Sequence, residues 1–340
     1  MYRCFTIPSV VGEPASGWYG HAEPVGSFPA VSAAPALAQL FLEVMQTIAH
    51  PATDSDLRDV ARIVGQIYGT ADSGQALLGQ FGEPAPTFAT RPFRSGSVRG
   101  QWVTAPGAGG DSILLYVHGR RFQFDEPPGV YSARLSAATR LPVLHLDYRL
   151  APEHPYPAAL DDVREAYQAL LDQGTPPNQI VLAGHSAGGT LTLSALQALR
   201  DAGRPMPAAA ITLSPLTDFT FSGESVAAND GRDVISQAEL GQVASAYLAS
   251  ADPAGAPQSP LAGDCSGLPP LLIACGDAEV LRDDAVRFAH RAAAAGVPVD
   301  LEIFEGMPHG FPVLSLDASE RLLTRIATFT AAATLTTPPR

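Results

Sequence analysis

The chain has 340 residues and a formal net charge of -13, with 46% hydrophobic and 16% charged residues. This length is enough for one large domain with a sizeable core. All 21 basic residues are arginine, and they are outnumbered by acidic residues. Nucleic acids and anionic membrane surfaces are bound by clustered Lys and Arg, so this charge balance argues against both as partners.

The cysteines and the apolar segments bear on the cellular location. The three cysteines, Cys4, Cys265 and Cys275, show neither a disulfide framework nor a metal-ligand spacing. We therefore expect a reducing compartment, and neither a metal nor another cofactor. The first residues have no sustained apolar core, and no stretch approaches the ~18 apolar residues of a membrane helix. We expect a cytoplasmic protein without a signal peptide.

The first part of the chain, residues 1–85, is treated as an N-terminal cap segment. It begins rich in Pro and Gly, and helical spacing of apolar residues then follows at 35–50 and 54–69. These two predicted helices either pack in the core or form a lid over a pocket, and the sequence leaves both possibilities open.

From residue 86 onward the pattern is typical of a catalytic α/β domain that extends to residue 340. Residues 87–107 resemble a hairpin, and short apolar runs then alternate with helical stretches. The predicted strands lie within 112–119, 141–149, 179–186, 208–215, 269–276 and 299–306, and the predicted helices within 131–140, 157–174, 188–203, 283–296 and 319–333. This alternation predicts a mostly parallel sheet flanked by helices. Residues 216–262 interrupt it, with a helix near 236–250, and are a candidate second cap piece.

The sharpest motif is a G-x-S-x-G sequence, Gly184-His185-Ser186-Ala187-Gly188. It follows an apolar run and opens a helical pattern, which is the context of a nucleophile elbow. The glycines allow a tight strand-to-helix turn that exposes the Ser186 hydroxyl. The backbone N–H of Ala187 then faces developing negative charge at the helix N-terminus. The alternative is an ordinary strand–helix turn.

A nucleophilic serine needs a base and an acid that orients it. Of the two histidines after Ser186, His290 falls within a predicted helix, whereas His309 lies in a Gly/Pro loop after a strand. His309 is therefore the expected base. Four acidic residues follow the strand 269–276, namely Asp277, Glu279, Asp283 and Asp284. The last two fit the first turn of the following helix, where acids favour the helix dipole, so Asp277 and Glu279 remain.

Several motifs together resemble the hormone-sensitive-lipase-like, or bacterial family IV, esterases of the α/β-hydrolase superfamily. They are "YVHG", "LDYRLAPEHPYPAALDD", "GHSAGG", "SPLTD", "SGLPPLLIACGDAEVLRDD" and "GMPHGF", in that order over roughly residues 100–330. The resemblance implies an α/β-hydrolase fold with a helical cap and a Ser–acid–His carboxylesterase. The family's Asp-x-Leu-x-Asp frame matches Glu279 to Asp283. The resemblance thus favours Glu279 as the acid and keeps Asp277 as the alternative.

The sequence departs from the family pattern at two places. His185 replaces the usual Asp before the nucleophile, and its imidazole is expected to titrate near neutrality. Arg120 and Arg121 replace the second and third glycines of the family's His-Gly-Gly-Gly motif, whose backbone N–H groups form the oxyanion hole. Arginine in a glycine-like conformation carries strain of roughly 1–3 kcal/mol.

Three outcomes are open for these arginines. The loop keeps its path and its N–H groups serve the oxyanion hole together with that of Ala187; the loop moves and hydrolysis is weak; or a guanidinium replaces a donor or binds a substrate carboxylate. His185 and Asp218, at the start of the insertion, are additional candidate substrate-binding residues.

The leading hypothesis is a serine hydrolase that cleaves a small-molecule carboxylic ester or lactone through an acyl-enzyme. Dimers are common in the families that the sequence resembles, so a homodimer is a candidate assembly. The altered oxyanion loop motivates an alternative, a non-hydrolytic cyclase, lyase or acyl transferase of secondary metabolism. A catalytically inactive ligand-binding receptor is a third possibility, although a receptor needs neither Ser186 nor His309.

Overall fold

The computed structural model describes residues 44–69, 87–129 and 131–335. A nine-stranded sheet with the order β1-β9-β8-β7-β6-β4-β5-β3-β2 forms its centre. Strands β2 and β3 form an antiparallel hairpin, β3 is antiparallel to β5, and the other neighbours are parallel. The strands are β1 (Met45–His50), β2 (Ala89–Ser95), β3 (Val98–Thr104), β4 (Ile113–Val117), β5 (Val143–Asp147), β6 (Ile180–His185), β7 (Ala209–Leu213), β8 (Leu271–Gly276) and β9 (Val299–Phe304).

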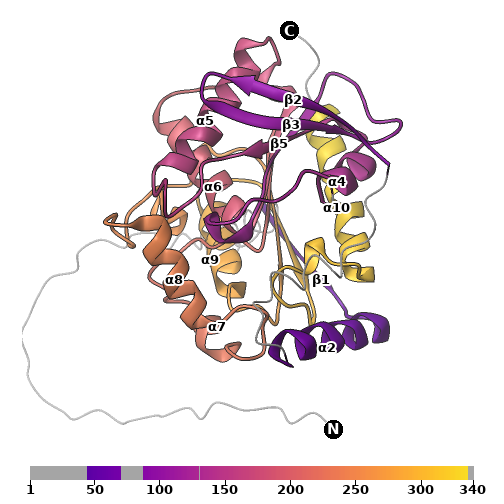
Figure 1. The fold of residues 1–340 in the computed structure, drawn as a ribbon, viewed down its shortest axis with the longest axis vertical. Helices are drawn as coiled ribbons and strands as arrows, with labels where there is room; N and C mark the ends of the chain where they lie inside the picture. The colour runs from indigo at the N-terminus through magenta and orange to yellow at the C-terminus, as the bar shows by residue number, and fades with distance from the viewer. Residues whose placement is uncertain (1–43, 70–86, 130, 336–340) are drawn as a thin grey trace, which may run out of the picture.

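Helices cover both faces of this sheet, as the sequence predicts (Figure 1). They are α2 (Asp54–Gly69), α4 (Tyr131–Thr139), α5 (Ala158–Asp172), α6 (Ala187–Asp201), α7 (Glu224–Ala228), α8 (Gln237–Leu248), α9 (Arg282–Ala294) and α10 (Asp317–Leu335). Helices α5, α6 and α9 contribute to the apolar cluster on one face, and α2, α4 and α10 contribute to the cluster on the other. The α/β-hydrolase fold with its mostly parallel sheet is thereby confirmed. Among the described helices, none is long and apolar enough to cross a membrane.

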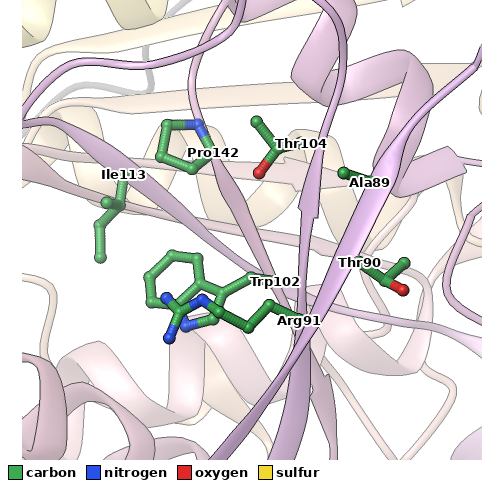
Figure 2. A pocket seen from close by; sticks show the side chains of 7 residues that line it. All are labelled: Ala89, Thr90, Arg91, Trp102, Thr104, Ile113 and Pro142. Atoms are coloured by element: carbon green, nitrogen blue, oxygen red, sulfur yellow. The ribbon is translucent and has the colours of Figure 1, made fainter.

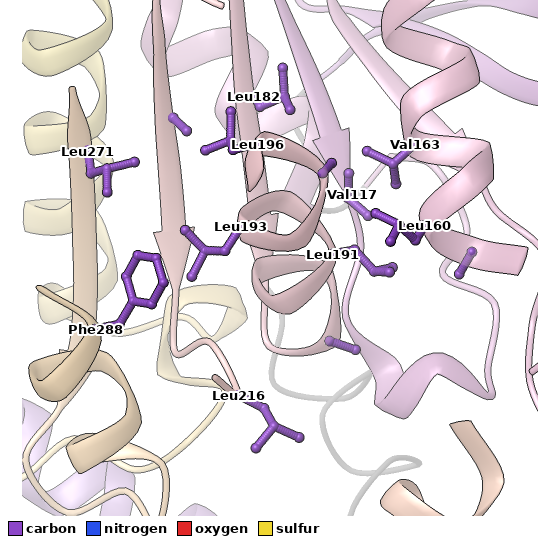
Figure 3. Packing of buried hydrophobic residues seen from close by; sticks show 14 of the residues in the cluster. Val117, Leu160, Val163, Leu182, Leu191, Leu193, Leu196, Leu216, Leu271 and Phe288 are labelled. Carbon is purple, nitrogen blue, oxygen red and sulfur yellow. The ribbon is translucent and has the colours of Figure 1, made fainter. Parts of the chain in front are cut away.

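The central strands β4, β6, β7 and β8 are buried at every residue and are mostly apolar, as is typical of parallel strands covered on both faces. Along β4, Leu115 and Val117 join one cluster, whereas Leu114 and Tyr116 join the other. This alternation follows from the period of two residues in a strand. Figure 3 shows the first cluster, in which side chains of α6 pack between strands of the sheet and helix α5.

The helix predicted over residues 35–50 is wrong at its C-terminal end. Residues 45–50 form β1, an edge strand that pairs in parallel with β9 from Met45↔Val299 to His50↔Phe304. The spacing of its apolar residues is compatible with a helix or a strand. The segment forms a strand because it pairs with the otherwise unpaired edge of β9. Residues 35–43 lie outside the described part of the chain.

The proposed boundary at residue 86 therefore divides the sheet rather than separating a cap from a body. Strand β1 completes the sheet, and α2 packs against α10, where Oδ1 of Asp56 accepts the N–H of Ala318 at 2.9 Å. The insertion between β7 and β8 carries α8, where a helix near 236–250 was expected, and also the short helix α7, which the sequence did not predict. We call these two helices with their loops, residues 216–262, the cap insertion.

Glu302 ties β1 to β9 and provides a test of this arrangement. Its carboxylate is fully buried, contacts Nε2 of His50 and accepts a hydrogen bond from Nε of Arg325 at 2.7 Å.

Glu302→Gln leaves one of these partners facing an amide group. We expect a loss of about 1–3 kcal/mol in the free energy of unfolding, and faster hydrogen exchange at 45–50 than in β8. Exposed Glu305 provides the control Glu305→Gln. Unchanged exchange at 45–50 in Glu302→Gln would contradict this account.

Candidate active site

Ser186 lies at the turn between β6 and α6, at the carboxyl edge of the sheet where open α/β sheets bind ligands. Its backbone has φ 53° and ψ -119°, an unfavourable conformation for a residue with a side chain. The turn closes only because its neighbours are glycines. A Cβ on Gly184 would lie 2.1 Å from the carbonyl oxygen of Gly188, and one on Gly188 would lie 1.9 Å from that of Val117.

Two other strands bring a histidine and a carboxylate to this serine. Nε2 of His309, in the loop after β9, lies 2.9 Å from Oγ of Ser186. Its Nδ1 lies 3.2 Å from Oε2 of Glu279, in the loop after β8. The other Glu279 oxygen accepts hydrogen bonds from Oγ of Ser214 at 2.7 Å and from the N–H of Gly276 at 2.6 Å. The buried carboxylate is thus fixed in its orientation toward the imidazole.

The other candidate acids are engaged elsewhere. Oδ1 of Asp277 accepts the N–H of Gly306 at 2.6 Å and so closes the turn after β9. Oδ1 of Asp284 accepts the N–H groups of Thr217 and Asp218, at 2.6 and 2.8 Å. The geometry therefore favours Glu279 over Asp277 as the partner of His309.

Asp233 is a residue of this site that the sequence reasoning missed. This fully buried residue of the cap insertion accepts the N–H of His309 at 2.6 Å and that of Val280 at 2.8 Å. It therefore joins the loop that carries the base to the loop that carries the acid. Burial raises the pKa of the Asp233 carboxyl to about 7, against the opposing charge of His309. No motif pointed to it, because it lies 76 residues before His309 in the insertion.

The surrounding charged groups shift the pKa of His309. Burial lowers the pKa of the imidazole, but the hydrogen bond and charge of Glu279 raise it, as does the charge of Asp233. The positive charge of Arg121 opposes them. The effects of Glu279 and Asp233 together exceed those of burial and Arg121, so the pKa of His309 lies above its ordinary value. The imidazolium is thus stabilised, which suits a group that must receive a proton from Ser186.

Residues 119–122, which we call the oxyanion loop after the role that the sequence predicts for them, hold their arginines in the backbone conformation of glycines. Arg120, Arg121 and Phe122 have φ values of 64°, 65° and 60°. The loop is braced from behind, because the Tyr148 hydroxyl donates to the carbonyl of Gly119 at 2.9 Å and the N–H of Ala151 donates to that of Phe122 at 2.8 Å. The glycine-like conformation that the sequence associates with strain is therefore present, and these contacts help to hold the loop in it.

The two arginine side chains point to different surroundings. Arg121 lines the cavity that contains Ser186 and His309, and its Nη2 lies 2.6 Å from Oε1 of Glu239. Arg120 does not line this cavity, and its charge instead opposes the rise in the pKa of half-buried Glu126. The remaining wall of the cavity is mostly apolar and consists of Phe122, Ala187, Leu216, Ile235, Leu240, Val243 and Leu281.

Two candidate substrate-binding residues do not line this cavity. His185 is buried with its ring stacked on that of His309, at 5.6 Å between centroids. Burial and the charge of His309 lower the pKa of His185 to about 3, so the expected titration near neutrality is wrong. Asp218 accepts hydrogen bonds from Ser222 and Arg287 and thus braces the start of the cap insertion. Neither side chain is placed to contact a substrate in the cavity.

A second hollow lies over the β2–β3 hairpin, away from Ser186. Figure 2 shows Trp102, Ile113 and Pro142 around it, with Arg91 beside the indole. The Arg91 guanidinium lies 5.6 Å from the centre of the Trp102 ring. Neither Ser186 nor His309 lines this second hollow, so the cavity that contains them is the better candidate active site.

Comparisons with known proteins agree with this geometry. Residues 114–313 match a family model described as the alpha/beta hydrolase fold. An acetyl-hydrolase of Streptomyces hygroscopicus is 42% identical over 241 residues, which are 70% of this chain and 79% of that protein. An esterase of Acinetobacter venetianus is 36% identical over 234 residues, which are 68% of this chain and 77% of that protein.

A solved esterase from the bacterial hormone-sensitive lipase family is similar in structure, with a TM-score of 0.77 and 36% identity over 83% of this chain and 99% of that chain. The protein is thus an α/β-hydrolase of the esterase type. Within that superfamily, the chain belongs to the hormone-sensitive-lipase-like, bacterial family IV esterases. It is a carboxylesterase-like hydrolase, as the sequence motifs predicted.

The pH dependence of hydrolysis tests the role of Glu279. A general base must be neutral, so kcat/KM falls as the pH drops through the pKa of His309. Because Glu279 raises that pKa, Glu279→Gln should move the acidic limb of the pH profile to lower pH. The rate itself should fall on the order of 10³–10⁴-fold, as happens when an orienting carboxylate is lost.

Asp277→Asn is the matched control, because it neutralises the alternative acid two positions away. It should leave the acidic limb in place. A large loss of rate in Asp277→Asn together with a normal profile in Glu279→Gln would overturn the preference for Glu279.

Proposed function

We propose that this protein hydrolyses carboxylic esters through an acyl-enzyme on Ser186, with His309 as the base and Glu279 as the acid that orients it. The observation that carries the proposal is the 2.9 Å separation of His309 Nε2 from Ser186 Oγ, with Glu279 against the opposite ring nitrogen. This arrangement is what an activated serine requires.

The steps follow from these positions. Oγ of Ser186 attacks the ester carbonyl carbon while its proton passes to Nε2 of His309. The tetrahedral intermediate collapses, His309 returns the proton to the leaving alcohol, and an acyl-enzyme remains. Water then loses a proton to His309, attacks the acyl carbon, and releases the acid while Ser186 regains its proton. A lactone would open by the same steps. The chemistry requires no cofactor or metal.

Three backbone N–H groups are proposed as donors to the oxyanion. The N–H of Ala187 opens α6 beside Ser186, where the helix dipole also favours negative charge. The N–H groups of Arg120 and Arg121 belong to a loop whose glycine-like φ values support the view that the loop keeps its path. Hydrogen bonds made only to the developing oxyanion accelerate the reaction because they are stronger in the transition state.

The cavity supports a small acyl group rather than a long chain. Apolar side chains of the cap insertion, Ile235, Leu240 and Val243, line the same cavity as Ser186. The relative from Streptomyces hygroscopicus is named an acetyl-hydrolase, and we propose acetyl esters as the preferred class. No observation favours the cyclase, lyase or acyl transferase alternative.

Hydrolysis of p-nitrophenyl acetate, butyrate and octanoate by the wild type and by Ser186→Ala tests this proposal. We expect the highest kcat/KM for acetate and the lowest for octanoate, because the cap-insertion side chains that line the cavity restrict the space beside Ser186. Ser186→Ala should lower turnover of each ester by at least ~10³-fold, because the nucleophile is gone and only binding and the oxyanion donors remain. Turnover in Ser186→Ala close to that of the wild type would refute the mechanism, and a preference for octanoate would refute the substrate class.

A further inference from the structure

Two consecutive residues of the oxyanion loop contact the same helix of the cap insertion. Arg121 pairs with Glu239 in the first turn of α8, at 2.6 Å. The ring of Phe122 stacks on Tyr247 in the last turn, with centroids 3.9 Å apart and planes 15° from parallel. Helix α8 therefore holds the loop near both of its own ends.

Glu239 is itself fixed before it meets Arg121. Its Oε2 accepts a hydrogen bond from the N–H of Ser236 at 2.8 Å, and Oγ of Ser236 accepts one from the N–H of Glu239 at 3.3 Å, so the two residues form a capping box at the start of α8. The other oxygen, Oε1, receives the Arg121 guanidinium. The two oxygens have separate roles, so the helix cap presents the carboxylate to Arg121 in one orientation.

The loop needs such a constraint because its conformation is costly. A glycine adopts φ near +65° freely, whereas arginine does so only where its surroundings compensate. The side chains of Arg121 and Glu239 are only 20% and 30% exposed, which limits the screening of their charges by water. An arginine in this slot thus couples the backbone of the loop to a carboxylate of the cap.

We propose that Glu239 is a positioning residue that acts through Arg121 to hold the loop N–H groups where the oxyanion develops. This inference rests on the proposed ester hydrolysis. Because a small misplacement of donors costs mainly transition-state stabilisation, Glu239 should affect kcat more than KM. A glycine in place of Arg121 needs no such support, so the effect of Glu239 should vanish in its presence.

A double-mutant cycle on p-nitrophenyl acetate tests the inference. Glutamine can still form the capping box, so Glu239→Gln removes the charge but keeps the start of α8. We expect it to lower kcat about tenfold with little change in KM. Arg121→Met, which leaves α8 untouched, should give the same loss. Glu239→Gln combined with Arg121→Gly should have the kcat of Arg121→Gly alone.

Glu224→Gln is the matched control, because it neutralises an exposed carboxylate in the first turn of α7 within the same cap insertion. It should leave kcat and KM unchanged.

Normal kcat in both Glu239→Gln and Arg121→Met, or an equal loss from Glu239→Gln with and without Arg121→Gly, would overturn the inference. A rise in KM alone would overturn it too, because the pair would then contact substrate. Absent wild-type turnover, or turnover retained in Ser186→Ala, would instead defeat the proposed function.

Discussion

The contact between Nε2 of His309 and Oγ of Ser186 joins two loops that are 123 residues apart in the chain. It exists because β6, β7, β8 and β9 are parallel neighbours, so the loops after them meet at one edge of the sheet. The elbow glycines add a second requirement, since a side chain at Gly184 or Gly188 would collide with backbone oxygens. The chemistry therefore depends on the register of the strands and on one very tight turn.

The cap insertion does more than cover the cavity. Asp233 holds the backbone of His309, Glu239 meets Arg121, and the Tyr247 ring supports Phe122. His309 and the loop of residues 119–122 are thus both attached to a segment inserted between β7 and β8. In this chain the two arginines make the attachment of the loop more important, because they occupy backbone conformations that glycine would adopt without strain.

The motifs allowed the sequence to predict the sheet, its flanking helices and the residues that meet at Ser186. These features depend on local signals: apolar runs, tight glycine turns, and a histidine in a loop after a strand. The choice of Glu279 over Asp277 came only from family resemblance, because both follow the same strand and only the packing distinguishes them.

What the sequence could not predict depends on contacts between distant segments. Residues 45–50 have apolar spacing that suits a helix, and the unpaired edge of β9 makes them a strand. Asp233 and Glu239 carry no motif, and each acquires its role from a partner far away in the chain. His185 was expected to titrate near neutrality because burial beneath His309 cannot be predicted from its neighbours in sequence.

The most direct test of the central claim is to identify the acylated residue. The protein would be mixed with p-nitrophenyl acetate, quenched in acid during turnover, digested, and analysed by mass spectrometry. The account predicts one added acetyl group on Ser186, absent in Ser186→Ala. Turnover without an acetylated peptide, or with acetyl on another residue such as His185, would contradict it.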